Sequence, residues 1–289
     1  MAKSGIVAAL TGASLVQKGA IAAGALFCVT VLWGAVQPRE EVPYDPVKAH
    51  HEHPEQIVWS HNGIGNIGIT GTFDRGQLQR GFKVYKEVCA ACHSISRVAF
   101  RDLLALGFSE GQAKAIAAEY TVPSIDESGE PTTRPATLAD KFPPVYANEV
   151  AARAAQNGAY PPDLSLITKA RHDGTNYVRS LLLGYRDEVP TDFQKADTLW
   201  YNPWFASLAI AMPPPLASDE QVEYTDGTAP TINNYATDVS AFLAWTAEPK
   251  LDNRKETGVA AIAFLLILTI LGYLSYKKVW RDVKKPKSA

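Results

Sequence analysis

TFDRGQLQRGFKVYKEVCAACH, residues 72–93, is the most informative part of the sequence. Leu78, Phe82 and Tyr85 are spaced as the buried stripe of an amphipathic helix, so the pattern predicts a helix from Asp74 to His93. The end of this helix carries two cysteines three positions apart, and a histidine follows the second one directly. The predicted helix therefore ends in a group of side chains that can bind a metal or a cofactor.

Further helices are predicted on both sides of the downstream loops. Ser109 and Gln112 form a capping-box pattern that opens a helix ending near Tyr120. Helical patterns recur at 148–156, 175–183 and 234–247. Residues 121–144 and 185–233 are rich in turn-forming residues and are predicted to be loops, and no strand pair is predicted. The fold class expected is mainly α with long loop insertions.

The pattern formed by Cys89, Cys92 and His93 favours a covalently attached haem. Two thiols at this spacing can form thioethers with the vinyl groups of one haem, and the adjacent imidazole can bind its iron. A structural zinc site is the first alternative, but it needs about four ligands, and the remaining cysteine, Cys28, lies in an apolar run. A thioredoxin-like CxxC is the second alternative, and its βαβ context is missing from the sequence pattern. A chance match is the third, but this motif ends an amphipathic helix in the part of the chain expected to be exported.

The candidate side chains for the sixth ligand are the five other histidines and Met212, which is the only methionine apart from Met1. Three prolines follow it and stiffen the segment that presents the sulfur, although a buried core methionine is the commoner interpretation. Histidine–methionine ligation would fill both axial positions and raise the reduction potential, which is typical of an electron carrier. Residues 185–211 contain no cysteine, so no disulfide can brace this loop; the aromatic residues that could brace it by packing are Trp200, Tyr201, Trp204 and Phe205.

Two uncharged apolar runs are long enough to span a membrane. Residues 258–276 form the first, and basic residues follow it, which predicts a transmembrane helix at 257–276 with a basic cytoplasmic tail at 277–289. Residues 19–36 form the second, so 1–36 fits either a cleaved signal peptide or a retained signal anchor. Residues 37–256 are then the exported domain under both interpretations.

The charge of the chain is distributed unevenly. The tail carries six basic residues and one acid, and the first 36 residues carry two lysines and no acid, which leaves residues 37–276 with a net charge of −9. A body of this charge excludes nucleic-acid binding and favours a cationic partner. The cluster of His50, His51 and His53 is assigned no chemistry, because a solvated stretch is the simpler interpretation.

Four segments in this order resemble the cytochrome c1 family, which supplies the haem subunit of the cytochrome bc1 complex. They are residues 72–93, PPDLSLITKARHDG at 161–174, IAMPPPL at 210–216 and TDVSAFLAWTAEPK at 237–250. The resemblance covers most of residues 73–280 and looks bacterial. It implies a mainly helical cytochrome c fold with long insertions, anchored by the C-terminal helix.

The resemblance also implies a set of site residues. Cys89 and Cys92 would attach one haem c, His93 and Met212 would be its axial ligands, and Arg171 would lie near a haem propionate. Two more positions match residues near the haem in the family, Pro162 and Tyr177.

The function implied is to take single electrons from the Rieske iron–sulfur protein and pass them to a soluble or membrane-bound cytochrome c. The implied partners also include the cytochrome b subunit and membrane lipid, within a dimeric quinol–cytochrome c oxidoreductase of the respiratory or photosynthetic chain. The location would be the bacterial plasma membrane, with the haem domain in the periplasm. A stand-alone haem enzyme such as a peroxidase, and a purely structural haem protein, are the alternatives.

Overall fold

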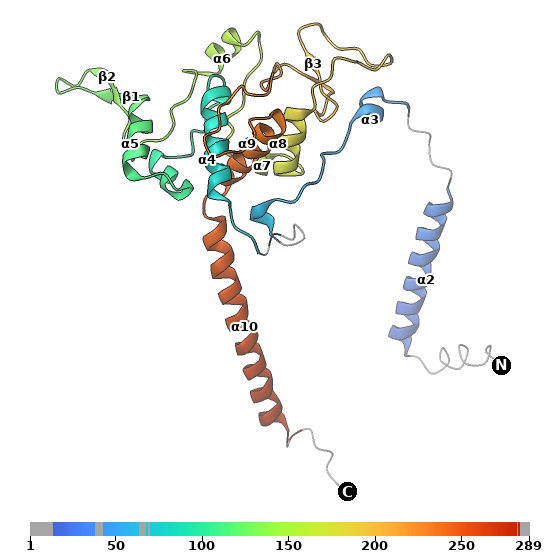
Figure 1. The fold of residues 1–289 in the computed structure, drawn as a ribbon. Helices are drawn as coiled ribbons and strands as arrows, with labels where there is room; N and C mark the ends of the chain where they lie inside the picture. The colour runs from blue at the N-terminus through green and yellow to red at the C-terminus, as the bar shows by residue number, and fades with distance from the viewer. Residues whose placement is uncertain (1–13, 38–42, 64–67, 69, 282, 284–289) are drawn as a thin grey trace. The chain divides into compact units, whose positions relative to one another are not determined.

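The computed structural model describes residues 14–37, 43–63, 68, 70–281 and 283. The chain divides into two units, Met1–Asp45 and Pro46–Ala289. The first unit holds α2 (Leu15–Val36), and the second holds a helical domain followed by α10 (Leu251–Trp280) (Figure 1). Helices predominate among the described residues, which confirms the predicted fold class.

The frame of the domain is the pair α4 (Arg75–Val84) and α9 (Ile232–Ala247). The predicted stripe is confirmed, since Leu78 and Phe82 are buried. At the crossing, a Cβ on Gly81 would lie 2.1 Å from the carbonyl oxygen of Asp238. Only a glycine allows the two backbones to approach this closely, and the approach fixes the direction of α4 toward the cysteines.

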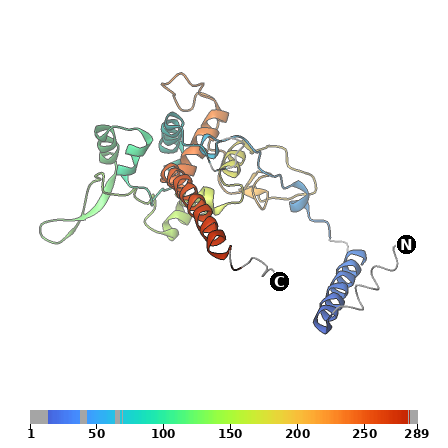
Figure 2. The ribbon, with the colours of Figure 1, turned by 90° about the horizontal axis from the view of Figure 1, so that it is seen from below.

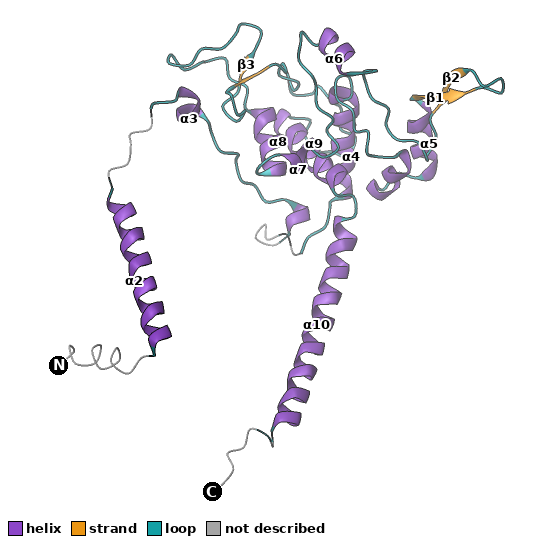
Figure 3. Cartoon of the chain, turned by 180° about the vertical axis from the view of Figure 1, so that it is seen from behind, coloured by secondary structure: helices purple, strands orange, loops and turns teal. Residues whose placement is uncertain are grey.

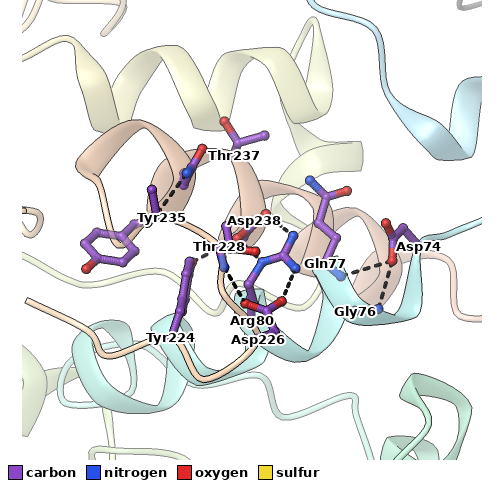
Figure 4. A network of polar contacts seen from close by, with 12 residues as sticks. Asp74, Gly76, Gln77, Arg80, Tyr224, Asp226, Thr228, Tyr235, Thr237 and Asp238 are labelled. Atoms are coloured by element: carbon purple, nitrogen blue, oxygen red, sulfur yellow. Dashed lines mark hydrogen bonds and ion pairs between the residues drawn. The ribbon is translucent and has the colours of Figure 1, made fainter. Parts of the chain in front are cut away.

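A partly buried ion pair joins the same two helices (Figure 4). Arg80 Nε donates to Asp238 Oδ2 at 2.7 Å, and a second arm of the guanidinium donates to Asp226 at 2.6 Å. Tyr224 donates its hydroxyl proton to Asp238 at 2.9 Å. Burial opposes the charge of Arg80, but the two carboxylates outweigh it and raise the pKa of the guanidinium. The buried carboxylate of Asp238 is thus fully compensated.

Two further helices pack beside α9, namely α7 (Ile167–Ala170) and α8 (Gly174–Leu183). Figures 1 and 3 show α7, α8, α9 and α4 grouped together, with long loops around them. The remaining described helical segments are α3 (Pro46–His50), α5 (Glu110–Ala118), α6 (Glu149–Ala155), two 3-10 turns (Ser60–Asn62 and Phe100–Leu106) and a π-helical turn (Tyr85–Cys89). The capping box of Ser109 and Gln112 is present at the start of α5.

The prediction of loop for residues 121–144 was wrong in part. β1 (Thr121–Ile125) and β2 (Pro131–Pro135) form an antiparallel hairpin that projects from the helices (Figure 2). Asp126 closes its turn by accepting the backbone N–H groups of Ser128 and Glu130. The prolines in this segment led to the prediction of a loop. They are tolerated here because both strands are edge strands, in which a missing N–H donor is allowed. A second pair, β3 (Trp200–Tyr201) and β4 (Ala209–Ile210), is too short to leave a period in the sequence.

Residues 46–62 are held against the domain, unlike the solvated stretch expected. His50 pairs with Asp192 at 2.9 Å, and Arg179 reaches Glu55 at 2.6 Å. His61 is buried between the rings of Trp59 and Phe73, and burial, aided by the nearby charge of Lys255, lowers its pKa to about 4. We name residues 46–59 the strap. No group of three or more potential metal-ligating side chains occurs among the described residues.

α2 and α10 are each long and apolar enough to cross a membrane, and their apolar side chains are exposed in this structure. α10 contains the predicted span and begins six residues before it. The predicted basic tail is described only as far as Arg281 and Val283, and its other residues lie outside the described ranges, as do residues 1–13 of the N-terminal segment.

Candidate functional site

The site begins where α4 changes its winding. α4 continues into the π-helical turn Tyr85–Cys89, so the predicted helix from Asp74 to His93 is regular only to Val84. The wider turn ends with the backbone N–H of Ala90 bonded to the carbonyl of Tyr85 at 2.8 Å. Such π turns often occur at functional positions. Here the turn delivers Cys89, and a tight turn that follows delivers Cys92 and His93.

The His93 ring is oriented by the segment that begins at Pro161. Its Nδ1 lies 2.8 Å from the carbonyl oxygen of Pro162. A carbonyl oxygen only accepts, so Nδ1 carries the proton and Nε2 keeps its lone pair in the neutral ring. Burial lowers the pKa of His93 and outweighs the opposing effects of Pro162 and Asp163, which favours this neutral form. A histidine prepared in this way could bind a metal through Nε2.

Asp163 fastens the chain on the C-terminal side of His93. Its carboxylate accepts bonds from Ser94 Oγ at 2.9 Å, from the N–H of Ser96 at 2.8 Å and from the N–H of Ser165 at 2.8 Å. Burial alone would raise the pKa of Asp163, but the bonds from Ser165 and Ser96 outweigh it and hold the pKa below its usual value. Leu164 N–H also donates to the Ser94 carbonyl at 2.8 Å. We call residues 162–165 the clamp.

Both thiols of the motif are free. Burial, and then the neighbouring Cys92, raise the pKa of Cys89 to about 12, so its sulfur is held as a thiol packed against the core. Redox-active CxxC cysteines instead sit where their pKa is lowered. Cys92 is half-buried, and Gln156 Nε2 lies 3.6 Å from its sulfur while donating to the hydroxyl of Tyr146 at 2.7 Å.

Met212 is half-buried and lies two residues beyond β4. Tyr185, which follows the end of α8, donates its hydroxyl proton to the Met212 carbonyl at 3.1 Å. The loop that carries the methionine is therefore tied to the end of α8. Leu216, four residues later, is buried in the same hydrophobic core against which Cys89 packs.

Arg171 lies at the C-terminal end of α7 and is exposed. Its guanidinium interacts with Tyr177, partly offsetting the burial that raises the pKa of that phenol. Tyr177 in turn neighbours Tyr185, whose pKa is raised by burial and then by Tyr177. Arg171, Tyr177 and Tyr185 therefore interact electrostatically, and Tyr185 is hydrogen-bonded to the backbone of Met212.

The donor set fits a haem group with two vinyl and two propionate substituents. Cys89 and Cys92 offer two free thiols, which can add across vinyl double bonds without any oxidant. His93 offers a bare imidazole nitrogen, Met212 a neutral thioether, and Arg171 a planar cation suited to a carboxylate. These five side chains could attach a haem, bind its iron and pair a propionate.

Several residues that shape the site were not found in the sequence. The clamp lies inside the segment 161–174, and the resemblance already implied that Pro162 is near the haem. The role of Pro162 as the acceptor for His93 could not be predicted, because the two residues are 69 positions apart in the sequence. Gln156 and Tyr185 carry no local signal at all, because each acts through a partner distant in the sequence.

Comparison with known proteins assigns the family. The model of the cytochrome C1 family matches residues 59–283. The chain is 42% identical over 289 residues to "Cytochrome c1" of Rhodospirillum rubrum, covering 94% of this chain and 99% of that protein. It is 46% identical to "Cytochrome b-c1 complex catalytic subunit, mitochondrial" of Candida albicans, covering 82% and 81%, and 48% identical to "Cytochrome c1 1, heme protein, mitochondrial" of Arabidopsis thaliana, covering 82% and 75%. This chain belongs to the cytochrome c1 family.

Proposed function

We propose that this chain is the membrane-anchored haem subunit of a quinol–cytochrome c reductase. It would accept one electron at a time from a Rieske iron–sulfur protein and deliver it to a c-type cytochrome, beside a cytochrome b subunit in a dimeric complex. The observation that carries the proposal is the His93 ring, protonated at Nδ1 by its bond to Pro162 and next to two free thiols. The names of the Candida and Arabidopsis relatives, which specify a b-c1 complex and a heme protein, support it.

In this proposal each site residue has a separate role. Cys89 and Cys92 attach one haem c covalently, His93 binds the iron through Nε2, Met212 binds it through sulfur, and Arg171 pairs a propionate. When bound, the haem supplies one-electron redox chemistry between ferric and ferrous iron. The chain tunes that chemistry, since a thioether ligand favours the ferrous state and two protein ligands leave no open position for oxygen or peroxide.

A peroxidase-like function is less well supported by the positions of the histidines. A peroxidase needs an acid–base side chain close to an open iron position. His172 is the candidate nearest to the proposed haem residues in the sequence, and its side chain is 98% exposed. His61 is buried beside Trp59 and Phe73 and packs near the start of α10, where Lys255 donates to its carbonyl.

The proposed topology places residues 37–256 in the periplasm, 257–276 in the plasma membrane and 277–289 in the cytoplasm. Lys277, Lys278 and Arg281 follow the apolar part of α10, and Tyr276 and Trp280 lie there as interfacial aromatics. Residues 1–36 would be a signal peptide or a second anchor with the same orientation. A reporter that functions only in the periplasm should be inactive when it is fused after Ala289. An active reporter would show that the topology is the opposite of the one proposed.

Isolation of the full-length protein from membranes tests the main proposal. We expect a haem that stays with the protein through acid–acetone extraction, and co-purification of a cytochrome b and an iron–sulfur protein. Complete extraction of the haem would refute covalent attachment. A haem protein isolated without either partner after mild solubilisation would refute the assignment to the complex.

The acidic body supports a cationic electron acceptor. Asp126, Glu127 and Glu130 are exposed at the tip of the β1–β2 hairpin, and Asp187 and Glu188 are exposed beyond α8. Electrostatic steering weakens with salt, since the screening length falls to about 8 Å at physiological ionic strength. Electron transfer to a basic cytochrome c should therefore slow as salt is raised, and a salt-independent rate would indicate a different kind of acceptor.

A further inference from the structure

The segment that leads into Met212 is a compact hairpin. In the β3–β4 pair, Trp200 is opposite Ile210 and Tyr201 is opposite Ala209. Asn202, at the start of the connecting loop, is fully buried; its side chain donates to the carbonyl of Leu181 at 2.8 Å and accepts the N–H of Trp204 at 3.1 Å. The hairpin is therefore fixed to α8, and Met212 follows it by two residues.

The hairpin also contains an unfavourable backbone conformation. Leu208 has φ of 60°, in the left-handed region that suits glycine better than leucine, and its side chain is fully buried. The Leu208 carbonyl accepts the N–H of Asn202 at 2.9 Å, and its own N–H donates to Phe205 at 2.8 Å. A conformation of this kind persists only where the surroundings hold it, and such sites cluster at functional positions.

The indole of Trp204 is inserted between the end of α8 and the strap. A Cβ on Gly184 would lie 2.2 Å from the Trp204 ring, so the ring packs directly on that backbone. The guanidinium of Arg186 lies 5.0 Å from the ring centre, and Nε1 donates to the carbonyl of His53 in the strap at 3.3 Å. Arg186 also forms two bonds to Glu52, which closes the strap over this ring.

We infer that Trp204 is a positioning residue for the sulfur of Met212. The indole joins α8, the strap and the hairpin, and so holds the hairpin in the strained shape that presents the methionine. Trp204 itself needs no contact with the haem. This inference rests on the proposed role of Met212 as an axial ligand, and it adds the reason why a loop without a disulfide can keep that ligand in place. Of the four aromatic candidates for bracing, it selects Trp204.

A merely structural tryptophan would affect stability without affecting the iron. A positioning residue should change how firmly the thioether stays bound, which alters two properties of the full-length holoprotein. The reduction potential should fall, because loss of sulfur ligation disfavours the ferrous state. Carbon monoxide should bind to the ferrous protein, because it competes for the position that the sulfur leaves open.

The experiment compares Trp204→Ala, Trp204→Phe, Met212→Ala and the matched control Trp200→Ala. Trp200 lies in the same hairpin, but its side chain is 44% exposed. We expect Trp204→Ala to shift the redox equilibrium toward the ferric state by about tenfold, which is about 59 mV for a one-electron couple, and to bind carbon monoxide. Trp204→Phe keeps an aromatic ring against Gly184 and should give a smaller change in the same direction. Trp200→Ala should match the wild type.

The outcomes separate this inference from the proposed function. If Met212→Ala lowers the potential while both Trp204 variants keep the wild-type potential and exclude carbon monoxide, the inference is wrong and the ligand assignment stands. If Met212→Ala changes neither property, the ligand assignment fails and the inference fails with it. If Trp204→Ala does not accumulate, Trp204→Phe alone decides, since its potential and carbon monoxide binding must differ from those of the wild type. An equal change in Trp200→Ala would also overturn the inference.

Discussion

Around His93, two short segments exchange hydrogen bonds directly: its ring meets the Pro162 carbonyl, and the next residue is bonded to Asp163 and Leu164. Around Met212 the arrangement is looser, because one bond from Tyr185 reaches its carbonyl and the rest of the support acts through the β3–β4 hairpin. One proposed ligand is therefore fixed by adjacent bonds and the other by a structure built at a distance. The difference suggests that the histidine side sets attachment, whereas the methionine side can be adjusted to set the potential.

The largest effect is expected from a variant that removes the covalent attachment of the haem on the histidine side. In Cys89→Ala/Cys92→Ala, neither thiol can form a thioether, so all of the haem should pass into the organic phase on acid–acetone extraction. The measurement is the haem content of the protein after extraction. Cys28→Ala is the matched control, because Cys28 is exposed on α2, and it should retain all of the haem. Haem retained in the double variant would show that attachment uses other side chains.

Met212→Ala should affect the methionine side alone. The haem should remain attached, because attachment depends on the two cysteines, but the iron would lose the sulfur that favours the ferrous state. Each tenfold change in a one-electron equilibrium is about 1.4 kcal/mol or about 59 mV, so the loss of a few kcal/mol of preference for the ferrous state should lower the potential by on the order of a hundred millivolts. Redox titration measures this value. An unchanged potential with a normal low-spin spectrum would mean that Met212 only packs in the core. Met212 would then not be a ligand, and the comparison of two ligand sides would be wrong.

Asp163→Asn tests the stability of the histidine side. The amide keeps one acceptor oxygen but loses the charge and the second acceptor, which should lower the free energy of unfolding by about 1–2 kcal/mol near neutral pH. The native pKa of Asp163 is lowered, so its contribution is complete above the unfolded value of about 4 and is lost as the pH falls through the native pKa. Chemical denaturation of both proteins across this pH range measures the difference.

The difference between the wild type and Asp163→Asn should therefore shrink in acid. Asp187→Asn provides the control, because Asp187 is an exposed aspartate in the loop after Tyr185, and its effect should be small at every pH. A stability loss that stays constant from neutral pH to well below 4 would indicate that the clamp does not depend on the carboxylate charge.

The same contrast explains how much the sequence could predict. The helix of residues 75–84 and the cysteine–histidine motif leave local signals, namely a helical period and a fixed spacing, and the fold class followed from such patterns. The strap could not be found, because it has no regular period and is held to the domain by partners more than a hundred positions away, such as Asn176 for Trp59. The β1–β2 hairpin was concealed by prolines that a two-stranded ribbon tolerates.

Within the site, the sequence could propose which side chains bind but could not show what orients them. The spacing of Cys89, Cys92 and His93 is a local property. The protonation of the His93 ring depends on a carbonyl at Pro162, and the placement of Met212 depends on Tyr185 and Trp204. Each of these contacts joins residues that are far apart in the sequence and follow no regular spacing. Only the folded structure therefore reveals them.

The smallest expected effect comes from Tyr185→Phe, which removes one hydroxyl and leaves the ring in place. A net hydrogen bond contributes about 0.5–1.5 kcal/mol, and about 1.4 kcal/mol corresponds to a tenfold change in an equilibrium. The loss can therefore shift the redox equilibrium by at most about tenfold, so we expect the potential to fall by less than about 59 mV. The matched control is Tyr146→Phe, which removes the hydroxyl that Gln156 contacts on the cysteine side. If the methionine side is the adjustable one, redox titration should show a lower potential for Tyr185→Phe and the wild-type value for Tyr146→Phe. The reverse order would mean that the potential is set on the side of the thioethers, and the assignment of roles to the two sides would have to be exchanged.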